Sequence, residues 1–198
     1  VEVDLSGVAG VELDSELPCA KLAFGSPASA YTCLRRTAGV PLGAMACKLK
    51  FLVKDVDPAK GEPEEEDQGY DDEYNLEELE LAAADFMRKV AVADFRESWE
   101  TMGNGCEKVE TFSLTYNSLR QAMEAIIEFL GMQVCDNTGN PADGARTHAV
   151  LLSGVFLGGV QVFAIVNLRT DGGKSVGMRL TVRSTDMQVS SFVAASVA

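Results

Sequence analysis

The sequence predicts an α+β fold, in which short strands typical of a β-sandwich precede a region with helices packed on an antiparallel sheet. Residues 1–56 alternate apolar and polar side chains, as half-buried strands do. The second half of the chain instead carries two helical patterns among several strand patterns. At 198 residues, the chain suits one large domain or two small ones. An acidic connector is expected at 57–73, after the first region.

In the first region, the clearest strand runs from Ala44 to Val56. Its apolar side chains, Cys47, Leu49, Phe51 and Val53, alternate with the lysines 48, 50 and 54. Pro and Gly interrupt the region repeatedly, at Pro18, Gly25, Pro27, Gly39, Pro41 and Gly43. These few short strands do not close a sandwich. We therefore expect a truncated sandwich whose first strands precede Val1.

The connector holds most of the chain's excess negative charge. The chain has 30 acidic and 17 basic residues, and residues 61–80 contain eleven of the acids and no Lys or Arg. Such a run is typical of a solvated connector rather than of a binding site. Alternation then resumes, and we predict a strand from Leu76 to Met87.

Helix-capping residues mark two helices in the second half. Asp94, followed three residues later by Glu97, begins a short helix that Gly103 ends. This helix places Phe95, Trp99 and Met102 on one face. Asn117 or Ser118 caps a longer helix that ends at Gly131.

Strand patterns surround these helices. One strand is predicted between the helices, at Val109–Leu114, and three follow the second helix, at His148–Phe156, Val160–Leu168 and Val176–Ser184. An apolar segment, 188–197, ends the chain. The order β, α, β, α, β, β, β is typical of helices packed on an antiparallel sheet.

Motifs of enzymatic chemistry are absent from the sequence. We find no phosphate loop, dinucleotide fingerprint, HExxH or GxSxG pattern, and we expect neither cofactor nor metal. A thiol hydrolase would have to pair Cys135 with His148, the only histidine, which begins an apolar strand where a structural role is more common. The basic residues are scattered and outnumbered, so we expect no nucleic acid partner. No run approaches the roughly 20 apolar residues that span a bilayer.

Trp99 is the best candidate for a binding residue. An aromatic stripe at helical spacing is as often core as binding site. Arg179 and Arg183, however, share one face of the strand Val176–Ser184, and a tryptophan bordered by arginines suits peptides that combine aromatic anchors with acidic flanks. We therefore predict a partner site made of Trp99, Phe95, Arg183 and Arg179, against the alternative that Trp99 is core.

Several collinear blocks resemble one family. They are GYDDEYNLEELELAAADFMRKVAVADFRESWE from Gly69, EKVETFSL from Glu107, EAIIEFLGM from Glu124 and THAVLLSGVFLGG from Thr147. Together with the upstream KFLVKDVDPAKGE, these segments are similar to the C-terminal appendage of gamma-COP, a large subunit of the COPI vesicle coat. The resemblance is good over residues 44–198 and loose before them.

This resemblance implies two domains. An immunoglobulin-like β-sandwich, 1–84, contains the acidic connector 57–73 and is followed by an α/β platform, 85–198, with helices on an antiparallel sheet. Trp99 and Phe95 match the family's tryptophan and phenylalanine on the first platform helix. Arg183 lies in a segment that aligns well with the family, and Arg179 is a weaker match. The family's surface docks cytosolic accessory proteins, chiefly Arf GTPase-activating proteins, in Golgi-to-ER and intra-Golgi transport. The other expected partners are coatomer subunits, and the expected location is the cytoplasm, at Golgi membranes and COPI vesicles, with membrane contact only through the coat.

The chain departs from the family pattern in two places. The family's sandwich has strands upstream of Val1, and the segment NLRTDGGK, which ends at Lys174, is longer than the corresponding segment of the family pattern. A clathrin-adaptor appendage shares the architecture and stays open as the nearest alternative, although the collinear blocks favour the COPI coat.

Overall fold

The computed structural model describes residues 2–4, 11–16, 26–27, 29, 31–36, 43–55, 57, 59–60, 68–172 and 175–197. The chain divides into a first unit, Val1–Leu81, and a second unit, Ala82–Ala198, whereas the sequence placed the boundary after residue 84. The expected turns at Pro18, Gly25, Gly39 and Pro41, residues 61–67 of the acidic run, and Lys174 lie outside the described residues. The predicted α+β class is confirmed, since antiparallel sheets and three α-helices make up the described part.

Strands make up the regular structure described in the first unit. They form three antiparallel sheets. The three-stranded sheet has the order β1 (Glu2–Asp4), β5 (Lys48–Val53), β6 (Tyr70–Asn75). The two-stranded sheets pair β2 (Val11–Glu16) with β3 (Thr32–Arg36), and β4 (Gly43–Met45) with β7 (Leu79–Leu81).

The β5–β6 pair corrects one boundary. Residues 70–73, expected in the acidic loop, are the first residues of β6, and Leu49 lies opposite Tyr74 while Lys50 lies opposite Glu73. The apolar and charged residues of β5 therefore take opposite faces, as the alternation predicts. Lys48 Nζ lies 2.8 Å from Glu73 Oε1, so Glu73 acts as a cross-strand partner of Lys48 rather than as a loop residue.

The predicted strand Leu76–Met87 was wrong as one element. It consists of β7, the 3₁₀-helix η1 (Ala83–Phe86), and the start of β8 (Met87–Lys89). Asp85 accepts a hydrogen bond from the Ala82 N–H at 2.7 Å, which stabilises the turn. A Cβ at Gly131 would lie 2.8 Å from Ala84 Cα, so this turn packs tightly against the end of a helix. Tertiary packing therefore overrides the local alternation here.

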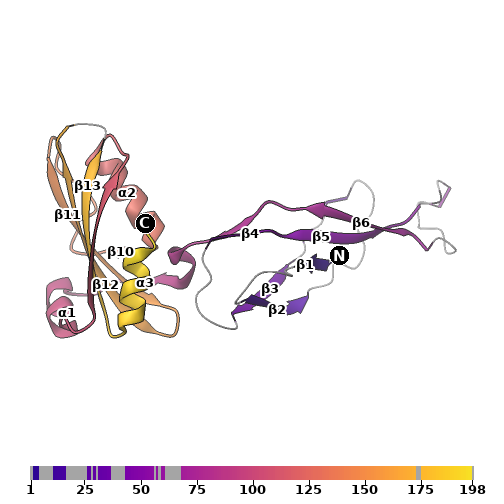
Figure 1. The fold of residues 1–198 in the computed structure, drawn as a ribbon, viewed down its shortest axis with the longest axis horizontal. Helices are drawn as coiled ribbons and strands as arrows, with labels where there is room; N and C mark the ends of the chain where they lie inside the picture. Colours follow the sequence, from indigo (N-terminus) through magenta and orange to yellow (C-terminus); the bar gives the residue numbers. More distant parts are fainter. Residues whose placement is uncertain are drawn as a thin grey trace. The chain divides into compact units, whose positions relative to one another are not determined.

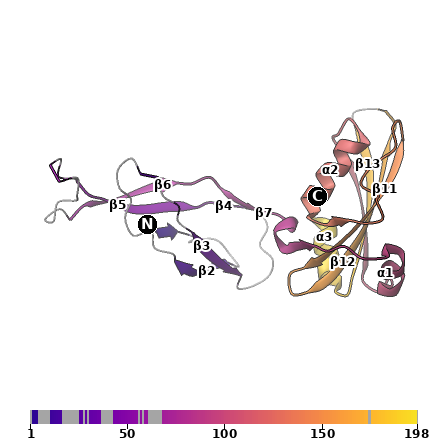
Figure 2. The ribbon, with the colours of Figure 1, turned by 180° about the vertical axis from the view of Figure 1, so that it is seen from behind.

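The second unit is built on one antiparallel sheet. Its strand order is β10 (Gln133–Val134), β11 (Thr147–Phe156), β12 (Val160–Thr170), β13 (Val176–Ser184) and β9 (Glu107–Leu114), with β8 also paired to β11. Its helices are α1 (Phe95–Met102), α2 (Leu119–Leu130) and α3 (Met187–Ala195). Figures 1 and 2 show α2 and α3 on one side of this sheet and α1 on the other.

The core of the second unit lies under α2 and α3. Strands β11, β12 and β13 each bury every second side chain on this face, and the fully buried members include Val150, Leu152, Val162, Val166, Leu180 and Val182. This period of two is expected for strands with one face on the core. The helices add Met123, Leu130 and Val193.

The predicted helix ends are confirmed. Asp94 accepts a hydrogen bond from the Glu97 N–H at 2.9 Å, and Gly103 ends α1. Ser118, rather than Asn117, caps α2, and Gly131 ends it in the left-handed conformation with φ +62°. The final apolar segment is helix α3, capped by Asp186. In the described part of the chain, no helix combines the length and the apolar composition needed to cross a bilayer.

Candidate functional site

The candidate site lies on the sheet face that α2 and α3 leave uncovered. The strand registers place its side chains in four rows across β11, β12, β13 and β9. From the α1 end these rows are Ser153, Phe163, Arg183, Glu107; then Leu151, Ile165, Thr181, Val109; then Ala149, Asn167, Arg179, Thr111; and last Thr147, Arg169, Gly177, Ser113. The two rows nearest α1 are buried or half-buried, whereas the two rows at the far end are exposed.

Helix α1 covers the first of these rows with its aromatic stripe. Phe95 is 2% exposed and meets Phe163 edge-on, with ring centroids 5.6 Å apart. Trp99 stacks on Phe95 at 5.7 Å and also packs against this cluster, which includes Cys135. Trp99 itself is only half-buried, so one part of the indole belongs to the core and another part meets solvent. Phe95 therefore supports the site from beneath rather than lining its surface.

Arg183 is fully engaged by its own unit. Its Nε donates to Glu107 Oε2 at 2.7 Å, and one terminal nitrogen donates to the Trp99 backbone carbonyl at 3.0 Å. Its guanidinium carbon also lies 4.2 Å from the centre of the indole ring, a cation–π geometry. The side chains of Arg183 and Glu107 are 17% and 29% exposed. Arg183 thus holds Trp99 in place from the sheet.

Arg179 lies apart from this cluster. It follows the same face of β13, four residues from Arg183, and its side chain is exposed. Asn167 and Thr111 lie opposite it on the neighbouring strands. An open depression of about 700 Å³ covers this part of the face, with Arg169, Gly177 and Ala149 also in its lining. The structure therefore brings Trp99, Phe95 and Arg183 together and leaves Arg179 at a second place.

Glu107 is the site residue that the sequence did not reveal. It lies directly opposite Arg183 across the β13–β9 pair. Opposite charges on two predicted strands are only a weak sign of an ion pair between them. The paired residues of β9 and β13 lie at least 62 residues apart in the chain, and their register does not follow from the pattern of either strand.

Cys135 and His148 have separate structural partners. The Cys135 thiol is buried and donates to the Ser153 hydroxyl at 3.2 Å, while His148 Nε2 lies 2.7 Å from the Thr138 carbonyl oxygen. A buried thiol that donates to a neutral hydroxyl is unlike an activated nucleophile. Among the described residues, no group of three or more His, Cys, Asp or Glu side chains is arranged to hold a metal ion.

Comparison with known proteins identifies the family. A family model described as the coatomer subunit gamma-1 C-terminal appendage platform matches residues 84–197, and one described as the coatomer gamma subunit appendage platform subdomain matches residues 1–82. The chain belongs to the coatomer gamma appendage family. Trp99, Phe95, Arg183 and Arg179 all lie within the first match, on the appendage platform.

Relatives from plants and animals support this assignment. Coatomer subunit gamma of Arabidopsis thaliana is 42% identical over 85% of the chain, and the gamma-2 subunits of Danio rerio and Homo sapiens are 40% and 36% identical over 91% and 100% of it. The chain spans 19%, 21% and 23% of the lengths of these relatives, so it corresponds to the appendage part of a coatomer gamma subunit.

Proposed function

We propose that this chain is the appendage of a COPI coat subunit and that its platform recruits accessory proteins. Arf GTPase-activating proteins are the main expected partners, in Golgi-to-ER and intra-Golgi transport. The role is non-enzymatic and needs no cofactor. One observation carries the proposal: Trp99 is half-buried on α1 of the domain that matches the family platform, and Phe95 and Arg183 hold it there.

The geometry suits an anchor for a partner's apolar side chain. A tryptophan whose conformation is fixed offers a large apolar surface at little cost in conformational entropy on binding. Phe95 supports the ring, and Arg183 fixes both the indole and the backbone carbonyl of the same residue. Trp99 would therefore present its exposed part in one orientation.

A single half-exposed aromatic anchor gives weak binding, on the order of micromolar, or about −8 kcal/mol. Many copies of the appendage on one coat would raise the effective affinity, because linked weak sites act through their local concentration. Coupling of coat assembly to partner recruitment then follows from avidity rather than from a single tight contact.

The remaining partners follow from the family. Other coatomer subunits would connect the appendage to the coat in the cytoplasm, at Golgi membranes and COPI-coated vesicles. Membrane contact would be indirect, and no nucleic acid is involved. The matched family models and relatives favour a coatomer appendage over a clathrin-adaptor appendage.

The test is a capture experiment from cytosol with the chain and two variants. Trp99→Ser removes the anchor, and Tyr116→Ser removes another solvent-accessible aromatic residue, 36% exposed, that lies between β9 and α2. Circular dichroism first establishes that all three fold. We expect Trp99→Ser to lose an Arf GTPase-activating protein that the parent and Tyr116→Ser retain.

Two results would contradict this expectation. If folded Trp99→Ser captures the same partners as the parent, the surface at Trp99 is not the recruiting surface. If Trp99→Ser unfolds, Trp99→Phe is tested, because it keeps an aromatic ring in the core and removes the indole edge. Unchanged capture by folded Trp99→Phe would also count against the site.

A further inference from the structure

The open sheet face divides into two places with different chemistry. At the α1 end, Arg183 already has a carboxylate, a carbonyl oxygen and an aromatic ring as partners. Replacing Glu107 by a ligand's carboxylate would leave Glu107 partly buried without its cation, which is costly. Arg183 is therefore unsuited to bind the acidic part of a ligand.

At the far end, Arg179 presents an available charge. Its guanidinium makes no hydrogen bond or ion pair with any residue that the structure describes, and its side chain is exposed. The neighbours across the strands, Asn167 and Thr111, are also exposed and offer amide and hydroxyl donors. Together these groups form a cationic, donor-rich surface.

Small residues create the depression beside Arg179. A Cβ built on Gly177 would meet only the Arg169 backbone oxygen within 4 Å, at 3.6 Å, so the sheet floor is bare there. Ala149 contributes only a methyl group on the neighbouring row. Arg169 and Arg179 thus rise above a floor of backbone and short side chains, in the hollow of about 700 Å³.

The charges around the hollow favour an anion. In the third and fourth rows of the face, counted from α1, no acidic side chain occurs, since the members are Ala149, Asn167, Arg179, Thr111, Thr147, Arg169, Gly177 and Ser113. Arg169 has one ion pair, with Asp171 at 3.6 Å, and both side chains are more than 70% exposed. An exposed pair of this kind is worth little and exchanges partners readily.

We propose that this hollow, on Arg179, Asn167 and Arg169, binds an acidic side chain of an extended peptide whose apolar side chain docks at Trp99. This inference rests on the proposed function, and it assigns the charge-reading role to Arg179 rather than to Arg183. The occupant is a partner peptide rich in Asp or Glu, because the hollow offers two guanidinium groups and neutral donors to carboxylates.

The strand geometry sets the spacing in that peptide. Arg179 and Arg183 are four residues apart on β13, or about 13 Å at a strand rise of about 3.3 Å per residue. Since Arg183 lies against the indole of Trp99, an extended peptide along β13 would bridge the two places with an apolar and an acidic residue about four positions apart.

The test uses fluorescent ten-residue peptides and the full 198-residue chain. The first peptide has one Phe and an Asp-Glu pair centred four residues away. A second replaces the pair by Asn-Gln, and a third moves the pair next to the Phe. We expect the first peptide to bind at least fivefold more tightly than the other two in fluorescence anisotropy titrations.

Variants of the chain then locate the acid-binding group. Arg179→Glu should weaken binding of the first peptide at least fivefold and leave the Asn-Gln peptide unchanged. Arg96→Glu reverses the charge of a different exposed arginine, on α1, and is the matched control. It should change the affinity of neither peptide. Arg179→Ala gives a milder loss without introducing a carboxylate.

Several outcomes would overturn the inference. Equal affinities for the acidic and the amide peptide would overturn it. An equal loss of affinity in Arg96→Glu and Arg179→Glu would also overturn it. A ten-residue single-stranded oligothymidylate that competes as well as the acidic peptide would also overturn it, by showing a general polyanion surface. Trp99→Ser separates the two proposals: if it abolishes binding of all three peptides while they do not discriminate acids, the docking function stands and the acidic subsite fails.

Discussion

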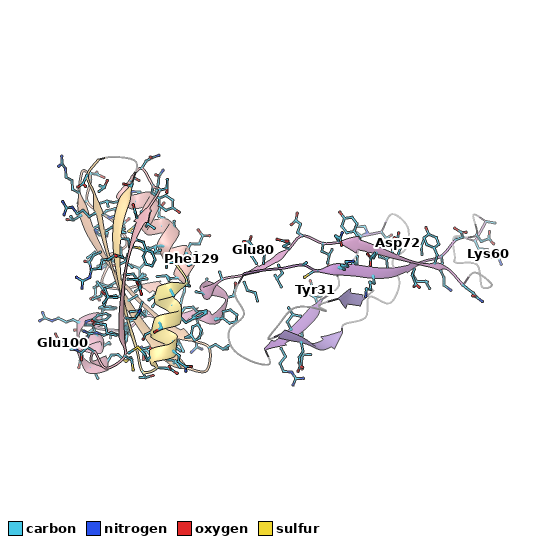
Figure 3. The ribbon with its side chains drawn as sticks, viewed as in Figure 1. Tyr31, Lys60, Asp72, Glu80, Glu100 and Phe129 are labelled. Atoms are coloured by element: carbon cyan, nitrogen blue, oxygen red, sulfur yellow. The ribbon has the colours of Figure 1, made fainter. Side chains whose placement is uncertain are left out.

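The two faces of the sheet in the second unit are built from alternate residues of the same strands, yet they serve different ends. On β13, Met178, Leu180 and Val182 are buried under helices, whereas Arg179 is exposed on the opposite face. Figure 3 labels Phe129 on α2 and Glu100 on α1, which lie on the two sides of this sheet. One face is covered by α2 and α3, and the other is covered only at the α1 end.

This difference separates the residues that stabilise the fold from those that we propose to bind a partner. The covered face removes apolar surface from water, which is the main source of stability. The open face contributes little burial beyond α1, so its polar residues are available for partners at small cost to the fold. Trp99 lies at the border between the buried and the exposed part of the open face, since it packs against the Phe95 cluster and is only half-buried.

The largest expected effect is on the covered face. Leu180→Ala removes a side chain that is 0% exposed, and we expect it to lower the free energy of unfolding of the second unit by about 2–5 kcal/mol. Urea denaturation followed by Trp99 emission measures this loss, because the chain has a single tryptophan and it lies in that unit. Thr181→Ala, next in the chain but on the open face, should cost well under half as much; equal losses would contradict the division.

An intermediate effect is expected at the border. Glu107→Gln leaves the partly buried Arg183 without its carboxylate, and we expect a loss of about 1–2 kcal/mol together with a change in the emission and acrylamide quenching of Trp99. Glu110→Gln is the control, since it removes the Lys108 partner on the other face of β9. An unchanged Trp99 signal in Glu107→Gln would show that the ion pair does not position the indole.

The smallest effect on stability is expected at the open end. Arg179→Ala removes an exposed side chain without a protein partner among the described residues, so the free energy of unfolding should change by no more than about 0.5 kcal/mol. The same denaturation measurement checks this. A loss above 1 kcal/mol would mean that Arg179 serves the fold, and it would weaken its assignment to ligand binding.

Local signals predicted the elements that end at caps and turns. Helix caps act within a few residues of themselves, so their effect is visible in the sequence. Asp94 and Ser118 accept hydrogen bonds from backbone N–H groups three residues later, and Gly131 ends α2 in the left-handed conformation. Strand β10 escaped prediction because two residues are too few to show a period. The 3₁₀-helix η1 escaped it because its position depends on the contact of Ala84 with Gly131, 47 residues away.

The sequence by itself determined the class, the order from α1 to β13 apart from β10, the face that α1 turns to the sheet and the family resemblance, because alternation, helical spacing and caps are local properties. The tertiary structure alone decided which residues meet. Strand register put Glu107 opposite Arg183 and thereby engaged the arginine that the sequence had assigned to a ligand. Register depends on pairing between strands far apart in the chain, and no local pattern contains it.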